Sequence, residues 1–219
     1  MGISTDKALR QRLIFFTIIL MLTGLFASRA LLSVSMILFL LLTCVHAKFL
    51  QQLDEFRRQP FLIGLSLLFF IPLLTWFWSD DKETWWRFIR IKLPLLLLPI
   101  AFAGEWHLGR RFWNYVAYTF ILLVLGGCAW SLIQYAGNYQ DMQDAYLKAK
   151  VIPTPFENDH VRFSLSVTIA ILCAAFLMKD KSYWWLLAFI ILVFVVYLHL
   201  LAARTGLFSL YIALFIAFI

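Results

Sequence analysis

Long apolar stretches, separated by short polar and charged segments, follow one another along the whole chain. About 20 mostly apolar residues are needed to cross a hydrocarbon core ~30 Å thick, so this pattern predicts transmembrane helices. We therefore expect an all-α fold, a polytopic transmembrane helix bundle that forms a single membrane domain over residues 1–219. Charges and turn residues divide it into eight candidate segments, at residues 13–26, 30–47, 61–78, 91–103, 112–136, 161–178, 183–203 and 206–219.

Local features refine several of these segments. Only three residues separate the first two segments, which predicts a tight helical hairpin. The fourth contains Pro94 and Pro99 and reaches spanning length only if residues 85–90 form a helical lead-in. Prolines inside a membrane are tolerated where neighbouring groups satisfy the freed backbone carbonyls. No cleavage site is evident after the first apolar run, so we expect it to be retained as a span.

The end of the chain must contain a reversal. From Tyr183 to Ile219 there are 37 residues, interrupted only by His199 and Arg204. A single helix of this length would extend about 55 Å, nearly twice the hydrocarbon thickness. Arg204, Thr205 and Gly206 supply the only charge and the only glycine of this stretch, so we place the turn there. The short last arm ends without flanking charge, and we expect the sequence to be the N-terminal part of a larger membrane protein.

Composition strengthens the membrane interpretation. The chain is 63% hydrophobic and 14% charged, whereas soluble domains have about 45–50% apolar and roughly 25% charged residues. This excludes a soluble domain, a disulfide scaffold and a disordered tail, and the net charge of +7 reflects membrane-flanking cations rather than nucleic-acid binding. The three cysteines lie in separate apolar runs without ligand spacing, and we expect no cofactor.

Loop charge gives the orientation by a narrow margin. With the N-terminus in the cytoplasm, the inner segments hold ten basic residues and the outer segments nine. The longest loop, residues 137–160, then lies outside. An outer face so rich in cations at helix ends suggests an anionic ligand, while most tryptophans lie near segment ends, where they anchor a helix at the interface.

Two arginines are the main binding candidates. Arg204 lies between two apolar arms, and arginines in such positions are costly and usually functional. Arg162 lies at the start of the sixth segment, where it could bind a ligand or form an ordinary surface ion pair with Asp159 or Glu157. Guanidinium groups bind phosphate oxygens in bidentate fashion, so arginines that converge at one leaflet suit a lipid-linked phosphate or pyrophosphate.

Other candidates have weaker support. Arg87 and Arg90 lie one turn apart on an amphipathic lead-in and suit either substrate binding or contact with membrane lipid. His160 and Thr205 flank the two main arginines as hydrogen-bonding partners. Glu157, Asp159 and His160 could bind a metal, but one cluster at a loop end is weak support, and we predict no metal site.

Short motifs carry a family resemblance. A Ser-Asp loop at residues 79–80 is followed by Lys-Leu-Pro-Leu-Leu-Leu-Leu-Pro at 92–99, Asn-Asp-His-Val-Arg-Phe-Ser at 158–164 and Ala-Arg-Thr-Gly at 203–206. In this order, within a multi-span N-terminal half, they resemble the O-antigen ligase and polymerase superfamily of the bacterial inner membrane. The last two motifs are the most specific.

The resemblance implies a metal-independent glycosyltransferase at the periplasmic face. Such an enzyme moves a glycan from undecaprenyl pyrophosphate to a lipid A-core or polysaccharide acceptor. By motif, Arg162 and Arg204 would bind the pyrophosphate. The family's proposed catalytic His belongs to a periplasmic loop beyond residue 219, so no catalytic residue is expected among those present.

Two alternatives remain open from the residues themselves. A secondary transporter or lipid flippase would line its substrate path with the same arginines, although no pairing of repeated halves is evident. A membrane scaffold without chemistry would use them only as interfacial anchors.

Overall fold

The computed structural model describes residues 2–45, 49–104, 108–137, 153–155, 159–178, 183–201 and 204–218. These residues form helices and no strand, which confirms the predicted all-α fold. Five of the described helices are long and apolar enough to cross a membrane, or six if one bent pair forms a single span. These helices indicate a membrane protein, but the predicted count of about eight spans is not confirmed.

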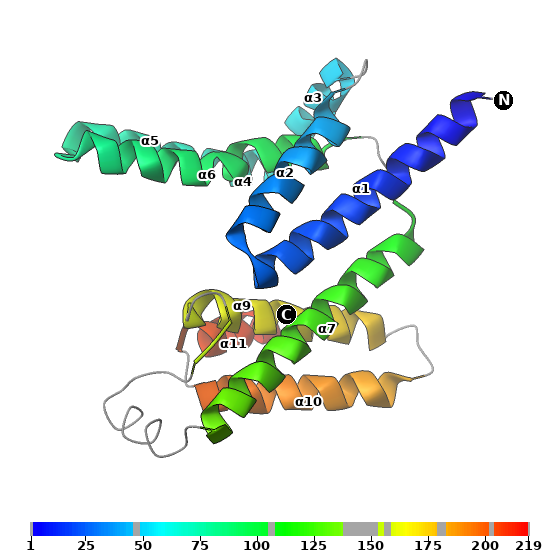
Figure 1. Cartoon of the computed structure of the whole chain (residues 1–219), viewed down its shortest axis with the longest axis vertical. Helices are drawn as coiled ribbons and strands as arrows, with labels where there is room; N and C mark the ends of the chain where they lie inside the picture. The colour runs from blue at the N-terminus through cyan, green and yellow to red at the C-terminus, as the bar shows by residue number, and fades with distance from the viewer. Residues whose placement is uncertain are drawn as a thin grey trace. The chain divides into compact units, whose positions relative to one another are not determined.

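The chain groups into two compact units (Figure 1). The N-terminal unit comprises Met1–Gly24 and Arg29–Gly109, and the C-terminal unit comprises Leu25–Ser28 and Arg110–Ile219. Each unit is described by itself below. The prediction of one membrane domain over residues 1–219 stays a prediction.

The N-terminal unit begins with the predicted helical hairpin. α1 (Gly2–Ala27) and α2 (Arg29–Cys44) are separated only by Ser28. The two helices approach closely at Gly24, where a Cβ atom would lie 2.7 Å from the backbone nitrogen of Leu32. At the open end of the hairpin, Arg10 Nε donates to the carbonyl of Leu42 at 3.1 Å. Arg10 thereby satisfies a carbonyl that the end of α2 leaves without a helical partner.

A short amphipathic helix follows. α3 (Phe49–Arg58) carries two exposed ion pairs, Asp54–Arg57 and Glu55–Arg58, and the two partners of each pair lie one helical turn apart. Its one buried residue is Gln52, whose Nε2 donates to the carbonyl of Ile100 at 2.7 Å. A buried amide requires such a partner, and this bond fixes α3 to the end of α6.

The second hairpin of this unit contains the proline-bearing segments. α4 (Pro60–Leu67), α5 (Phe70–Leu74) and the 3₁₀ turn η1 (Thr75–Trp78) run out, and α6 (Lys82–Phe102) returns beside them (Figure 1). The helical lead-in is confirmed and starts earlier than expected, because the Asp81 carboxylate caps α6 by accepting the N–H groups of Glu83 and Thr84. α6 continues through Pro94 and Pro99 but is not among the five candidate spans.

The C-terminal unit is built around α9. It contains α7 (Arg110–Gly137), α9 (His160–Met178), α10 (Trp184–Leu201) and α11 (Arg204–Phe218). α9 packs against each of the other three and has the most buried residues among these helices. Of the predicted outer loop 137–160, residues 138–152 and 156–158 lie outside the described part of the chain.

The final reversal is confirmed, but its predicted residues were wrong. α10 ends at Leu201 and Arg204 is already the first residue of α11, with residues 202–203 outside the described chain. The helices fold back, since His199 Nε2 lies 3.3 Å from the Tyr211 hydroxyl. Because α11 begins at Arg204, Gly206 lies inside a helix. Its lack of a side chain allows close packing between helices and does not form a turn.

Candidate functional site

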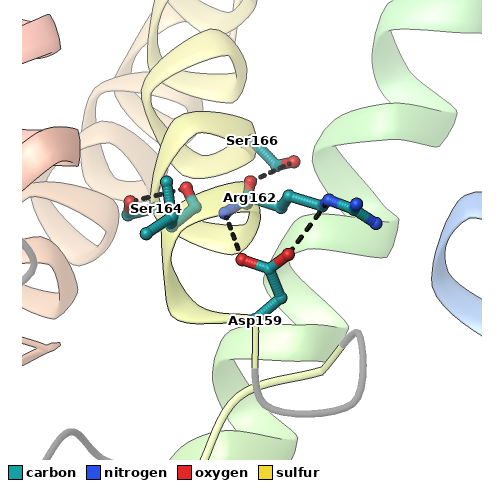
Figure 2. A network of polar contacts seen from close by, with 5 residues as sticks. Asp159, Arg162, Ser164 and Ser166 are labelled. Atoms are coloured by element: carbon teal, nitrogen blue, oxygen red, sulfur yellow. Dashed lines mark hydrogen bonds and ion pairs between the residues drawn. The ribbon is translucent and has the colours of Figure 1, made fainter. Parts of the chain in front are cut away.

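Asp159 organises the start of α9. Its Oδ1 accepts the backbone N–H of Arg162 at 3.1 Å, the N-cap arrangement for which Asp is favoured. Its Oδ2 lies 3.0 Å from the Nε of Arg162, so one carboxylate holds both the backbone and the side chain of that residue (Figure 2). The structure thus shows the surface ion pair that the sequence left as one alternative for Arg162.

This ion pair is open to solvent. The side chain of Arg162 is 63% exposed and that of Asp159 is 35% exposed. Exposed pairs of this kind contribute about 0–1 kcal/mol to stability. A phosphate group, which presents several oxygens to one guanidinium, can therefore replace the carboxylate at small cost.

The opposite side of α9 contacts the start of α11. A Cβ atom on Gly206 would lie 2.5 Å from the Cβ and 2.8 Å from the Oγ of Ser164, a distance that only glycine permits. One turn further along α9, Thr168 Oγ1 donates to the carbonyl of Gly206 at 3.1 Å. The first turn of α11 therefore packs against the second and third turns of α9, so the two segments that carry the sequence-predicted arginines lie side by side near their starts.

The arginines themselves flank this contact. Arg162 precedes Ser164 by two residues, as Arg204 precedes Gly206, and two residues correspond to about 200° around a helix. Figure 2 shows the side chains of Arg162 and Ser164 on opposite sides of α9. Arg204 is exposed like Arg162. The structure brings the two helix starts together, with each arginine on the side of its helix away from the contact.

The two lesser candidates lie at the same helix starts. His160 is the first residue of α9 and half-buried, and Thr205 is the second residue of α11 and exposed. The first turn of a helix presents N–H groups that lack helical partners, together with the positive end of the helix dipole. Each of these helix starts, with the arginine that it carries, therefore favours an anionic group.

A buried polar chain supports the start of α9. The Tyr197 hydroxyl of α10 donates to Ser131 Oγ at 2.8 Å, and Ser131 Oγ of α7 donates to the carbonyl of Pro153 at 2.5 Å. Phe163 stacks edge-on against Tyr197, with ring centroids 5.7 Å apart. These contacts fix residues 153–155 and the first turn of α9 against α7 and α10.

Glycine also sets the position of Phe163. A Cβ atom on Gly127 of α7 would lie 2.7 Å from the ring of Phe163 and 3.1 Å from Pro155. A Cβ atom on the neighbouring Gly126 would have no such contact within 4 Å. Gly127 thus provides the space that lets the start of α9 lie against α7.

Models of known protein families, curated proteins and solved structures give no match to this chain. The transferase interpretation therefore stays a prediction from the short motifs.

The remaining predicted residues lie elsewhere. Arg87 and Arg90 belong to α6 in the N-terminal unit, and the Arg90 guanidinium lies 5.8 Å from the centroid of the Trp86 ring. Of the weak metal candidates, Glu157 is outside the described chain. Within the described residues, no group of three His, Cys, Asp or Glu side chains could hold a metal ion.

The sequence reading missed the contact that joins the two helix starts. Ser164 and Thr168 are four residues apart on one face of an apolar helix, a spacing of small polar residues typical of close helix packing in membranes. The sequence pattern predicts a turn at Gly206, whereas the structure places it in α11. The signal was present, but a single sequence does not say which helix such a face meets.

Proposed function

We propose that the adjoining starts of α9 and α11 bind the pyrophosphate of a polyprenyl-linked glycan. In this proposal the whole protein transfers the glycan to a lipid A-core or polysaccharide acceptor at the periplasmic face of the bacterial inner membrane, with the N-terminus in the cytoplasm. The supporting observation is the contact of Gly206 with Ser164, which places the arginine-bearing helix starts side by side.

Binding would begin with an exchange of partners at Arg162. Its guanidinium leaves Asp159 for oxygens of one phosphate. Because each arginine lies on the side of its helix away from the Gly206–Ser164 contact, the long side chains of Arg162 and Arg204 must swing around their helix starts to meet at one pyrophosphate. His160 and Thr205 lie next to these arginines and supply further hydrogen-bond donors. Bidentate contacts of this kind fix the orientation of the diphosphate as well as its position.

The arginines would then serve the chemistry electrostatically. The acceptor hydroxyl oxygen attacks the anomeric carbon, the bond from that carbon to the pyrophosphate oxygen breaks, and negative charge grows on the leaving group. Fixed guanidinium groups stabilise this charge in the transition state. The proton of the acceptor hydroxyl passes to a general base, a role that the family resemblance gives to a His of a periplasmic loop.

Glycan transfer by the whole protein tests this proposal. Arg162→Ala and Arg204→Ala should each reduce transfer from a lipid-pyrophosphate donor by about two orders of magnitude or more, the scale of losing one transition-state contact. Lys at either position should restore little, because an ammonium lacks the bidentate geometry. Arg57→Ala on α3, also an exposed cation with an acidic partner, is the matched control and should retain transfer. Near-normal transfer by either arginine variant would remove that residue from the site.

A further inference from the structure

The turn between η1 and α6 carries an open aromatic groove. Its volume is about 690 Å³, and its walls include Leu73, Trp76, Phe77, Trp85 and Trp86, with Lys82 and Glu83 at the rim. All of these residues belong to the N-terminal unit. In Figure 1 the turn forms the end of the α4–α6 hairpin that is farthest from α2 and α3.

The groove is held by specific contacts. Trp85 is buried and donates its Nε1–H to the carbonyl of Pro72 at 3.1 Å. Its ring packs edge-on against Trp76, with centroids 4.6 Å apart, and stacks on Trp86. Lys82 Nζ donates to the Trp76 carbonyl and lies 4.3 Å from the centroid of the same ring. The aromatic walls are thus fixed before a ligand arrives.

Cations alternate with an aromatic ring along one stripe of α6. Lys82, Trp86 and Arg90 are spaced four residues apart, which places them on the same side of the helix. The backbone of Arg90 lies about 12 Å along α6 from that of Lys82. Its guanidinium nevertheless lies over the Trp86 ring, one helical turn closer to the connection between η1 and α6. Helical side chains lean toward the N-terminus of their helix. The charged groups of Lys82 and Arg90 are therefore both directed toward the end of α6 at which the groove lies.

The other arm of the hairpin is apolar at this level. Residues 60–78 form a candidate span, and the exposed surface of its last two turns includes Ile71, Leu74, Phe77 and Trp78. The apolar arm, residues 60–78, lies beside an α6 arm that carries Lys82 and Arg90. This combination fits a hairpin turn at the boundary between hydrocarbon and headgroups, where Trp and basic residues gather. Arginines below that boundary extend toward phosphate groups.

We infer that this groove binds one anionic phospholipid, with an acyl chain against Phe77 and Trp86 and the phosphate between Lys82 and Arg90. Charge complementarity favours an anionic lipid, because α6 carries four cations, two of them on this stripe, against the single carboxylate of Glu83 at the rim. This inference is independent of the proposed transfer reaction, since it concerns only the N-terminal unit.

Lipid retention by the intact chain tests the inference. The protein in mild detergent is titrated with phosphatidylglycerol or phosphatidylcholine, and bound lipid is counted by native mass spectrometry. We expect one phosphatidylglycerol per chain, bound about ten-fold or more weakly by the variant with both Lys82→Gln and Arg90→Gln. The matched control joins Arg57→Gln and Arg58→Gln, two exposed cations of α3 in the same unit, and should bind as wild type.

A second readout guards against a folding defect. Phosphatidylglycerol with brominated acyl chains should quench tryptophan fluorescence, and Trp86→Phe should remove part of that quenching while far-UV circular dichroism stays unchanged. Equal binding of phosphatidylcholine, or equal retention by the Lys82 and Arg90 variant, would overturn the inference. Displacement of the bound lipid by a polyprenyl pyrophosphate would also overturn it and assign the groove to the transfer substrate.

Discussion

Gly206 lies so close to Ser164 that a Cβ atom at its position would stand only 2.5 Å from the Ser164 Cβ, so that one of the two helices would have to shift. This contact, together with the Thr168 hydroxyl on the Gly206 carbonyl, joins the starts of α9 and α11. The proposed pyrophosphate site therefore depends on a glycine that touches no substrate.

Gly206→Ala should lower the free energy of unfolding and also weaken pyrophosphate binding. The added methyl would overpack the contact, at a typical cost of about 1–3 kcal/mol in the free energy of unfolding. Because α11 would shift from α9, the substitution should also weaken pyrophosphate binding. Thermal unfolding in detergent micelles measures the first effect and ligand titration the second.

A compensating change separates crowding from other causes. Ser164→Gly removes the two nearest atoms that the new methyl would meet and leaves Leu198 Cδ2 at 3.2 Å. The variant with both substitutions should therefore lose less stability than the sum of the two single variants. Simple additivity of the two losses would show that the Gly206–Ser164 contact is not the cause.

Gly127 and Gly126 should differ sharply although they are neighbours in α7. Gly127→Ala places a methyl 2.7 Å from the Phe163 ring and should destabilise by about 1–3 kcal/mol. Gly126→Ala meets nothing within 4 Å and should be neutral or raise stability by up to about 1 kcal/mol, because Ala favours helix. Matched thermal melts check this, and equal melting temperatures of the two variants would contradict the placement of α9 on α7.

Asp159→Asn should tighten pyrophosphate binding. Asn caps a helix about as well as Asp, so the start of α9 is retained while the ion pair with Arg162 is lost. Since that exposed pair is worth up to about 1 kcal/mol, the gain should reach about five-fold. Asp159→Ala is the control, because it removes the cap as well and should destabilise α9 by about 0.5–2 kcal/mol. Weaker binding by the Asn variant would mean that Asp159 itself belongs to the ligand site.

Asp81 provides a test by pH. The pKa of its carboxyl lies below the ordinary 3.8, first because the Thr84 hydroxyl donates to it, with backbone N–H groups and Arg87 adding to the effect. A lowered pKa in the folded state stabilises the cap of α6 above pH 3.8, and this contribution is lost as pH falls through the lowered value. A carboxyl ¹³C titration should show a midpoint below 3.8 that rises in Thr84→Val. A wild-type midpoint at or above 3.8 would contradict this capping geometry.

The fold was predictable where a single physical constraint decided it. Apolar length predicted the helices, and the three-residue gap after the first segment predicted the α1–α2 hairpin. The number of spans was not predictable to the same degree. α6 mixes a cationic first half with an apolar second half, and α11 is shorter than a span, so composition alone leaves their placement open.

The sequence indicated which residue types to consider for the candidate site, but not the packing contacts that hold its helices together. Bilayer cost singled out Arg204, and the motif singled out Arg162. Three features of the site come from packing between distant segments: the Gly206–Ser164 contact, the chain from Tyr197 through Ser131 to Pro153, and the pairing of Gly127 with Phe163. Glycine in an apolar run fits both a turn and a close helix contact, and only the structure distinguishes them.

Binding of a polyprenyl pyrophosphate to the chain in lipid nanodiscs, measured with Arg162→Ala, Arg204→Ala and the variant with both changes, tests the shared site most directly. If both guanidinium groups hold one diphosphate, each single change should weaken binding by about ten-fold or more, the scale of a contact between charged groups. The two losses should be non-additive, and a polyprenyl monophosphate should respond to fewer of the changes. Equal binding by wild type and all three variants would contradict the account.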